Sequence, residues 1–292
     1  MIISVILNGS FPQLVNKTMF LGVGAQKSGT TWLSNYLAGH PEVYMSALKE
    51  MHFWGNRTAT ANWPNSAFRK RLKRMQEQTH PDTRVVQLKS ALRERLKMDG
   101  DIEKYVQYFD TRVQKQHAFG EISPAYCKLP LDEFELIKSH FPDIKVIFLM
   151  RNPTDRLWSQ IRFSEDAETL EAMEQKIDTA FEKPVYLDRM DYVSTIRTIQ
   201  SCFAPENIHF EFFERLFTPE AVDRVCNFLG VGSHPGEFSK KRNVSVKIPL
   251  QLSLRVEIVR KLEPQYAYLR DLFDGDIPLK WQNDLTALQN TL

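Results

Sequence analysis

The chain has 292 residues, of which 42% are hydrophobic and 11% aromatic, and this is enough to bury one large α/β core or at most two modest domains. We expect a single domain over residues 1–292. Its 38 Lys and Arg against 36 Asp and Glu give a net charge of +2, so nothing in the overall balance points to a nucleic-acid partner, and any electrostatic attraction must be local.

The three cysteines, Cys127, Cys202 and Cys226, are widely spaced, and none lies in a CxxC or a Cys/His cluster of metal-ligand spacing. We therefore expect neither a disulfide framework nor a metal site. The first apolar run, residues 2–7, has no basic segment before it and is followed by Asn8 and Gly9. It is too short for a signal segment or a membrane span, so we expect a cytoplasmic protein. The sequence carries no sign of its oligomeric state.

In chain order, apolar runs that read as buried strands alternate with stretches of helical spacing. The predicted strands are residues 19–23, 145–150 and 207–213, with a short one at 118–121; the helices are 30–38, 154–163 and one ending near 229–230. Such strand, turn and helix units predict an α/β protein with a P-loop-like three-layer fold, a central parallel sheet flanked by helices on both faces.

Residues 55–117 lie between the first two units and contain the chain's one basic stretch. Residues 69–97 hold ten Lys and Arg against three acids. A charge run of this kind is ordinarily a solvated helical face. The alternative is that residues 55–117 form a helical, basic insertion that serves as a lid or acceptor-side wall and attracts an anionic acceptor.

The turn after the first strand, residues 24–32 (GAQKSGTTW), has the composition of an anion-binding loop. It would bring several backbone N–H groups and the positive end of a helix dipole to one point. The spacing of Gly24 and Gly29 matches G-x-x-x-x-G, but Thr30 stands where a nucleotide P-loop requires lysine, and the cation, Lys27, lies inside the loop. The loop therefore lacks the arrangement of lysine and hydroxyl that a nucleoside-triphosphate kinase uses to bind phosphates and magnesium.

This stretch, QKSGTTW, resembles the 5′-phosphosulfate loop of sulfotransferases that use 3′-phosphoadenosine 5′-phosphosulfate (PAPS). The resemblance implies that the donor is bound by Gln26, Lys27, Ser28, Gly29, Thr30, Thr31 and Trp32. Lys27 would also be catalytic, because it would neutralise the charge that grows on the leaving phosphate.

A second motif, residues 150–159 (MRNPTDRLWS), follows a predicted strand, and ligands of open α/β sheets bind at that edge. It looks like the 3′-phosphate site of the same family, with Arg151 as a charged donor and Ser159 as a hydroxyl donor. Tyr192 would line the adenine or belong to the core. The basic loop with Lys241, Arg242 and Asn243 is similar to the one that closes over the 3′-phosphate.

Residues 48–54 (LKEMHFW) resemble a segment of heparan-type and bacterial sulfotransferases in which a glutamate is the catalytic base. The resemblance implies this role for Glu50, with His52 as the alternative base or a residue that shapes the site. We expect Phe53 and Trp54 to raise the pKa of Glu50 by desolvation. The alternative is a surface Lys–Glu pair over a packed aromatic ring.

Residues 120–126 (GEISPAY) resemble the family's acceptor-lining segment, which implies acceptor contacts for Glu121 and Tyr126, with Trp54 beside them. Ile122 replaces a lysine there, which argues against a heavily sulfated polysaccharide, whereas the basic stretch argues mildly for one. Residues 269–281 are similar to the family's closing segment.

Together these resemblances imply a PAPS-dependent sulfotransferase of the bacterial or heparan-type branch. It would transfer a sulfuryl group in line to a hydroxyl or amine of a small-molecule, glycan or lipid acceptor and release 3′-phosphoadenosine 5′-phosphate (PAP), with no metal. Two alternatives remain: a P-loop small-molecule kinase, for which Glu121 is the candidate magnesium ligand, and a non-catalytic nucleotide-binding scaffold.

Overall fold

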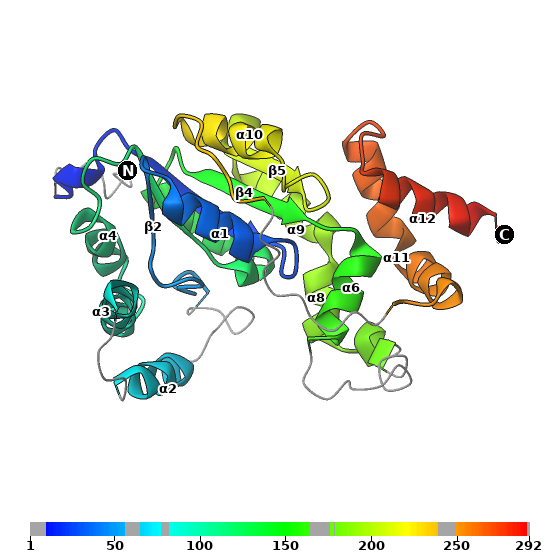
Figure 1. Cartoon of the computed structure of the whole chain (residues 1–292), viewed down its shortest axis with the longest axis horizontal. Helices are drawn as coiled ribbons and strands as arrows, with labels where there is room; N and C mark the ends of the chain where they lie inside the picture. Colours follow the sequence, from blue (N-terminus) through cyan, green and yellow to red (C-terminus); the bar gives the residue numbers. More distant parts are fainter. Residues whose placement is uncertain are drawn as a thin grey trace.

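A five-stranded, wholly parallel sheet lies at the centre of the computed structural model, which describes residues 10–55, 65–76, 82–163, 176–177, 179–238 and 249–290 (Figure 1). The strand order is β2-β3-β1-β4-β5, and each neighbouring pair is parallel. The strands are β1 Thr18–Gly24, β2 Val43–Met45, β3 Ala118–Ile122, β4 Lys145–Met150 and β5 Ile208–Phe212.

The predicted α/β class and all four predicted strands are confirmed. The prediction missed β2, because three residues do not make a recognisable alternating pattern.

The helices are α1 Thr30–Gly39, α2 Asn65–Gln76, α3 Thr83–Met98, α4 Ile102–Asp110, α5 Leu131–His140, α6 Pro153–Ile161, α8 Pro184–Met190, α9 Tyr192–Cys202, α10 Pro219–Leu229, α11 Leu252–Leu272 and α12 Leu279–Gln289. Short 3-10 turns span Pro12–Leu14, Pro124–Lys128 and Pro205–Asn207. None of the helices in the described ranges is long and apolar enough to cross a membrane.

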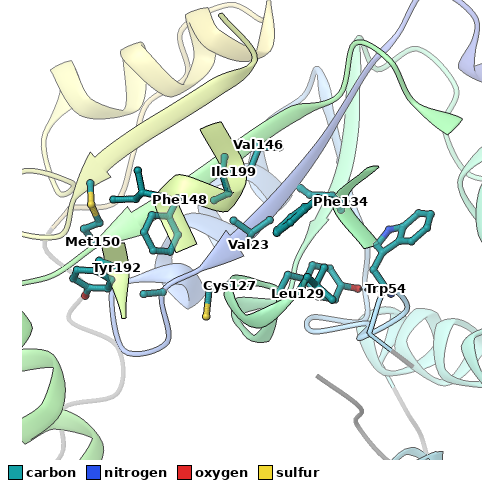
Figure 2. Packing of buried hydrophobic residues seen from close by; sticks show 14 of the residues in the cluster. Val23, Trp54, Cys127, Leu129, Phe134, Val146, Phe148, Met150, Tyr192 and Ile199 are labelled. Atoms are coloured by element: carbon teal, nitrogen blue, oxygen red, sulfur yellow. Dashed lines mark hydrogen bonds between the residues drawn. The ribbon is translucent and has the colours of Figure 1, made fainter. Parts of the chain in front are cut away.

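Both faces of the sheet are buried, which is why β4 (KVIFLM) reads as a continuous apolar run. Val146, Phe148 and Met150 point into one core cluster, and Ile147 and Leu149 into the other. Helices α1 and α10 cover the second face, while α4, α5 and α9 are among those that cover the first. Figure 2 shows side chains of β1 and β4 packed with those of α5 and α9 in the first cluster.

The order of the strands determines where a ligand can bind. β1 is central, and the chain leaves it through α1 toward β2 on one side, whereas β4 lies on its other side. In open α/β sheets such a reversal of direction leaves a crevice at the carboxyl ends of the strands. The turns after β1, β3 and β4 therefore meet at one edge, and these turns carry the predicted motifs.

Helices α2, α3 and α4 lie within residues 55–117. They lie beside the β2 edge in Figure 1, and α6 and α8 lie farther along the same side of the sheet. Helices α11 and α12 pack on each other, and α11 also packs on α6, which begins directly after β4.

Candidate active site

The turn between β1 and α1 folds as an anion-binding loop. Gly29 is the residue before the helix and has a φ of 87°, and a Cβ there would lie 2.8 Å from a side-chain carbon of Leu216. Only glycine fits such a position. The N-terminus of α1 has no side-chain cap, and an uncapped helix N-terminus of this kind favours an anion.

Lys27 and Arg151 come together at this edge although 124 residues separate them. The Arg151 Nη1 donates to the Lys27 carbonyl oxygen at 3.1 Å, and its guanidinium lies 4.5 Å from the centre of the Phe213 ring. The Arg151 Nε, which is buried, has no hydrogen-bond partner in the described part of the chain. The two predicted anchors thus adjoin, as the pairing of β1 with β4 requires.

Tyr192 is hydrogen-bonded to the backbone of Arg151. Its hydroxyl donates to the Arg151 carbonyl at 2.9 Å and accepts from the Arg151 N–H at 3.3 Å, and the residue is 1% exposed. The structure therefore supports the core alternative for Tyr192, with a position that orients the arginine.

The surroundings of Lys27 are strongly cationic. Burial lowers the pKa of its ammonium, and the charges of Arg151, Arg162 and Arg156 lower that pKa further. Arg156 is fully buried; its Nη1 donates to Gln160 at 2.8 Å, but its Nε and Nη2 have no hydrogen-bond partner among the residues that the structure describes. Buried cations without a counter-charge destabilise a protein. The residues present therefore fit a multiply charged anion.

Sequence reasoning did not find Arg156, although it lies within the second motif. Its position on the helix gives no clear signal, because the residues three and four positions away, Asn152, Pro153, Ser159 and Gln160, do not form an apolar face.

The other predicted donor residues lie around the loop. Ser28, Thr30 and Ser159 are buried, and the Gln26 Oε1 is buried with no hydrogen-bond partner within the described ranges. Trp32 is 8% exposed and packs against Phe217 and Phe238. For Thr31 and these side chains, donor contact stays a prediction. Lys241, Arg242 and Asn243 lie outside the described residues.

Glu50 lies in the segment after β2, between two basic side chains. Its carboxylate is 2.6 Å from the Lys49 Nζ and 3.4 Å from the His52 Nε2, and its side chain is 34% exposed. Burial would raise the pKa of Glu50, but the hydrogen bond to His52 and the charge of Lys49 outweigh burial and lower that pKa to about 2.

The expectation of a raised Glu50 pKa is therefore wrong. Phe53 and Trp54 belong to the hydrophobic core, at 2% and 1% exposure, and pack against Tyr105. Glu50 is left beside its polar neighbours.

Trp54, Glu121 and Tyr126, the predicted acceptor contacts, are all 0–1% exposed. The Glu121 carboxylate accepts from Ser123 at 2.7 Å, Tyr126 at 2.8 Å and the Met51 N–H at 3.1 Å. The structure gives these three residues a supporting position behind the Glu50 segment. Glu121 is also unsuited to hold magnesium, because its oxygens are already engaged, and no cluster of three potential metal ligands occurs within the described ranges.

The ten cations of residues 69–97 differ in how far they are exposed to solvent. Seven of its ten cations are exposed, as a solvated face predicts, and Arg71 and Lys89 are half-buried. Arg95 is fully buried and donates to the backbone of the Glu50 segment. Counting charges along the sequence cannot separate such a residue from its exposed neighbours.

The fold and the site define an open parallel α/β protein with a cluster of cations at the carboxyl edge of its sheet, beside a carboxylate held in an adjoining loop. A sequence model described as the sulfotransferase family matches residues 20–235, and the chain belongs to that family.

Two known proteins illustrate the relationship. The membrane-associated sulfotransferase kil1 of Dictyostelium discoideum is 25% identical over 147 residues, a match that covers 50% of this chain and only 22% of kil1. The crystal structure of a sulfotransferase from Alicyclobacillus acidocaldarius superposes with a TM-score of 0.66 at 23% identity and covers 92% of this chain and 100% of that one. This second likeness concerns the fold.

Proposed function

We propose that the chain transfers a sulfuryl group from PAPS to a hydroxyl or amine of an acceptor and releases PAP. The observation that carries the proposal is the convergence of Lys27, Arg151 and Arg156 on one buried region in which Arg156 and Arg151 keep unpaired N–H groups. A donor with phosphates on both its 5′ and 3′ positions needs two cationic anchors, and the turns after β1 and β4 supply them.

Lys27 and the loop amides would hold the 5′-phosphate. In-line transfer moves negative charge onto the oxygen that bridges sulfur and phosphorus as that bond breaks. A fixed ammonium and backbone N–H groups stabilise such charge without reorganisation of solvent. Burial and, after it, the same cationic surroundings lower the pKa of Lys27, and a bound dianion would oppose this shift.

Glu50 would accept the proton of the attacking group. Its carboxylate is ionised throughout the physiological pH range because Lys49 and His52 stabilise the charge, so it is always in the form that a base requires. His52, with its Nε2 3.4 Å from Glu50, is the alternative base or orients the carboxylate. The acceptor class, whether a small molecule, a glycan or a lipid, belongs to the same proposal.

Thermal unfolding with PAP tests donor recognition. We expect PAP to raise the melting temperature without magnesium, since a ligand at a hundred times its Kd stabilises by ~2.7 kcal/mol. Lys27→Met should abolish most of this shift, whereas Lys97→Met, at an exposed position on α3, should retain it. Stabilisation by magnesium-ATP alone would contradict the proposal and support a kinase.

A further inference from the structure

The segment that carries Glu50 and His52 has no regular secondary structure and an unfavourable backbone. Glu50 has a φ of 61° and His52 a φ of 47°, and such left-handed conformations cost non-glycine residues on the order of 1–2 kcal/mol each. A segment of this kind keeps its shape only where its surroundings hold it. The surroundings here hold it from two sides.

The first side is a network centred on the Glu121 carboxylate, at the end of β3. The Met51 N–H donates to Glu121 at 3.1 Å, and the His52 N–H donates to the Ser123 Oγ at 3.2 Å, which itself donates to Glu121 at 2.7 Å. The Glu50 N–H donates to the Ile122 carbonyl at 3.3 Å. Three successive N–H groups are thereby fixed to one short stretch of chain.

Tyr126 extends the network along the segment. Its hydroxyl accepts from the N–H groups of Phe53 at 2.8 Å and Trp54 at 3.3 Å and donates to Glu121 at 2.8 Å. Every backbone N–H from residue 50 to residue 54 therefore has a partner, and all but one of these partners lead to the same buried carboxylate. Buried N–H groups require such partners.

The second side is Arg95, from the last turn of α3. Its Nε donates to the Met51 carbonyl at 2.6 Å and its Nη2 to the His52 carbonyl at 2.8 Å. The guanidinium is fully buried and lies 5.4 Å from the centre of the Phe68 ring of α2. Two adjacent carbonyls match the fork of a guanidinium, which a lysine ammonium does not reproduce.

Arg95 and Glu121 thus lie on opposite edges of one peptide segment. Burial raises the pKa of Glu121, and the hydrogen bonds from Ser123 and Tyr126 oppose that rise. Burial lowers the pKa of Arg95, and Tyr126 and Glu121 partly restore it. Both side chains are fully buried, and each is held there by hydrogen bonds to the segment or to its immediate neighbours.

We propose that Arg95 and Glu121 are positioning residues that fix the Glu50 carboxylate and His52 relative to the acceptor, so that α2 and α3 control sulfuryl transfer and leave donor binding unaffected. This inference rests on the proposed function. It gives the helical insertion a role that does not depend on its exposed charge.

The test compares Arg95→Lys with Arg93→Lys, an exposed position on the same helix. Transfer is measured from radiolabelled PAPS at saturation to a boiled extract of the source cells, and PAP affinity by calorimetry. We expect Arg95→Lys to lower the transfer rate at least about 10-fold, on the scale of a lost acid/base term, with the Kd for PAP changed less than about twofold. Arg93→Lys should match the wild type in both.

Hydrogen exchange supplies a readout that needs no acceptor. In Arg95→Lys the amides of residues 51–54 should exchange at least about 10-fold faster, because local opening becomes easier, while amides of the 25–29 loop keep their wild-type rates. Ser123→Ala is a milder second variant that removes one hydroxyl of the network, and the same pattern is expected in it.

Wild-type transfer and exchange rates in Arg95→Lys and Ser123→Ala would overturn the inference. A joint loss of transfer and of PAP binding would also overturn it, because the residue would then serve the fold as a whole. A wild-type protein that binds PAP and transfers no label would instead contradict the proposed function, and the exchange rates would still decide whether Arg95 fixes the segment.

Discussion

Glu50 shows how immediate neighbours determine the chemistry of a carboxylate. Two competing effects act on its pKa: burial raises it, and the contacts with His52 and Lys49 lower it. The contacts dominate because they are short, 2.6 Å to Lys49 and 3.4 Å to His52. A base of this kind is weak but permanently ionised, so the proposed reaction would depend on placement of the acceptor more than on basicity.

The dependence of transfer on pH follows from this. A base acts only when deprotonated, so activity is lost as the pH falls through its pKa. With the pKa of Glu50 lowered to about 2, the transfer rate at saturating PAPS should stay flat as the pH is lowered from 8 to about 5, where an ordinary glutamate, of pKa ~4.3, would begin to lose activity. A fall in the transfer rate as the pH drops through ~6.5, where histidines ordinarily titrate, would assign the base to an imidazole.

Candidate site residues could be predicted from the sequence where they lie in a recognisable motif. Lys27, Arg151 and Glu50 were identified from their sequence context, and the structure brings the first two together. The direction of the Glu50 pKa shift was not predictable, because adjacent positions in sequence say nothing about which way Phe53 and Trp54 point. The role of Arg95 was not predicted for a related reason, because its hydrogen-bond partners lie 43 and 44 residues away in the sequence.

At the scale of elements, the C-terminal helices hold the turn after β4, which is the proposed second anchor of the donor. Asn152, directly after Arg151, donates through its amide to the Asp284 carboxylate of α12 at 2.7 Å. The Tyr266 hydroxyl of α11 is 2.9 Å from Asp284 and 3.0 Å from Asn152. Arg255 binds Asp284 with two nitrogens, at 2.6 and 2.7 Å. These helices lie beyond residue 235, where the family match ends.

Removal of the Tyr266 hydroxyl tests this support. Tyr266→Phe should lower the free energy of unfolding by ~1–3 kcal/mol, because buried polar partners lose a hydrogen bond, and should weaken PAP binding. Tyr268→Phe is the control, since the Tyr268 ring contacts Arg197 at 5.3 Å and the side chain is partly exposed. Urea denaturation and calorimetry with PAP measure both effects. Equal PAP affinity in the two variants would show that α11 does not act on the second anchor.

For the whole molecule, a net charge of +2 conceals local extremes of charge. Cations gather at the carboxyl edge around Lys27, while Asp284 and Asp155, next to the turn after β4, pair with Arg255, and Glu211 pairs with Arg224. The parallel sheet and its anion-binding edge were predictable, because apolar runs and turn residues are local signals. The networks that hold the site were not, since they join segments 40 to 130 residues apart.

His209 on the edge strand β5 should make the stability of the whole protein sensitive to mild acid. Burial lowers its pKa to about 4, with a contribution from the charge of Arg224. Glu211 does little to offset this, because its carboxylate binds Arg224 at 2.6 Å and lies 3.9 Å from His209. The folded protein therefore keeps His209 neutral at pH values where the unfolded chain, with a histidine pKa of ~6.5, binds a proton.

Stability is consequently present in full above pH ~6.5 and lost as the pH falls toward 4. Between pH 7 and 5 the loss due to this residue is roughly 2 kcal/mol. In urea denaturation, His209→Gln should reduce the difference in free energy of unfolding between these two pH values by about that amount, whereas His117→Gln, at a position 64% exposed, should leave it unchanged. An unaltered difference in His209→Gln would mean that His209 binds its proton equally well in the folded and unfolded chain.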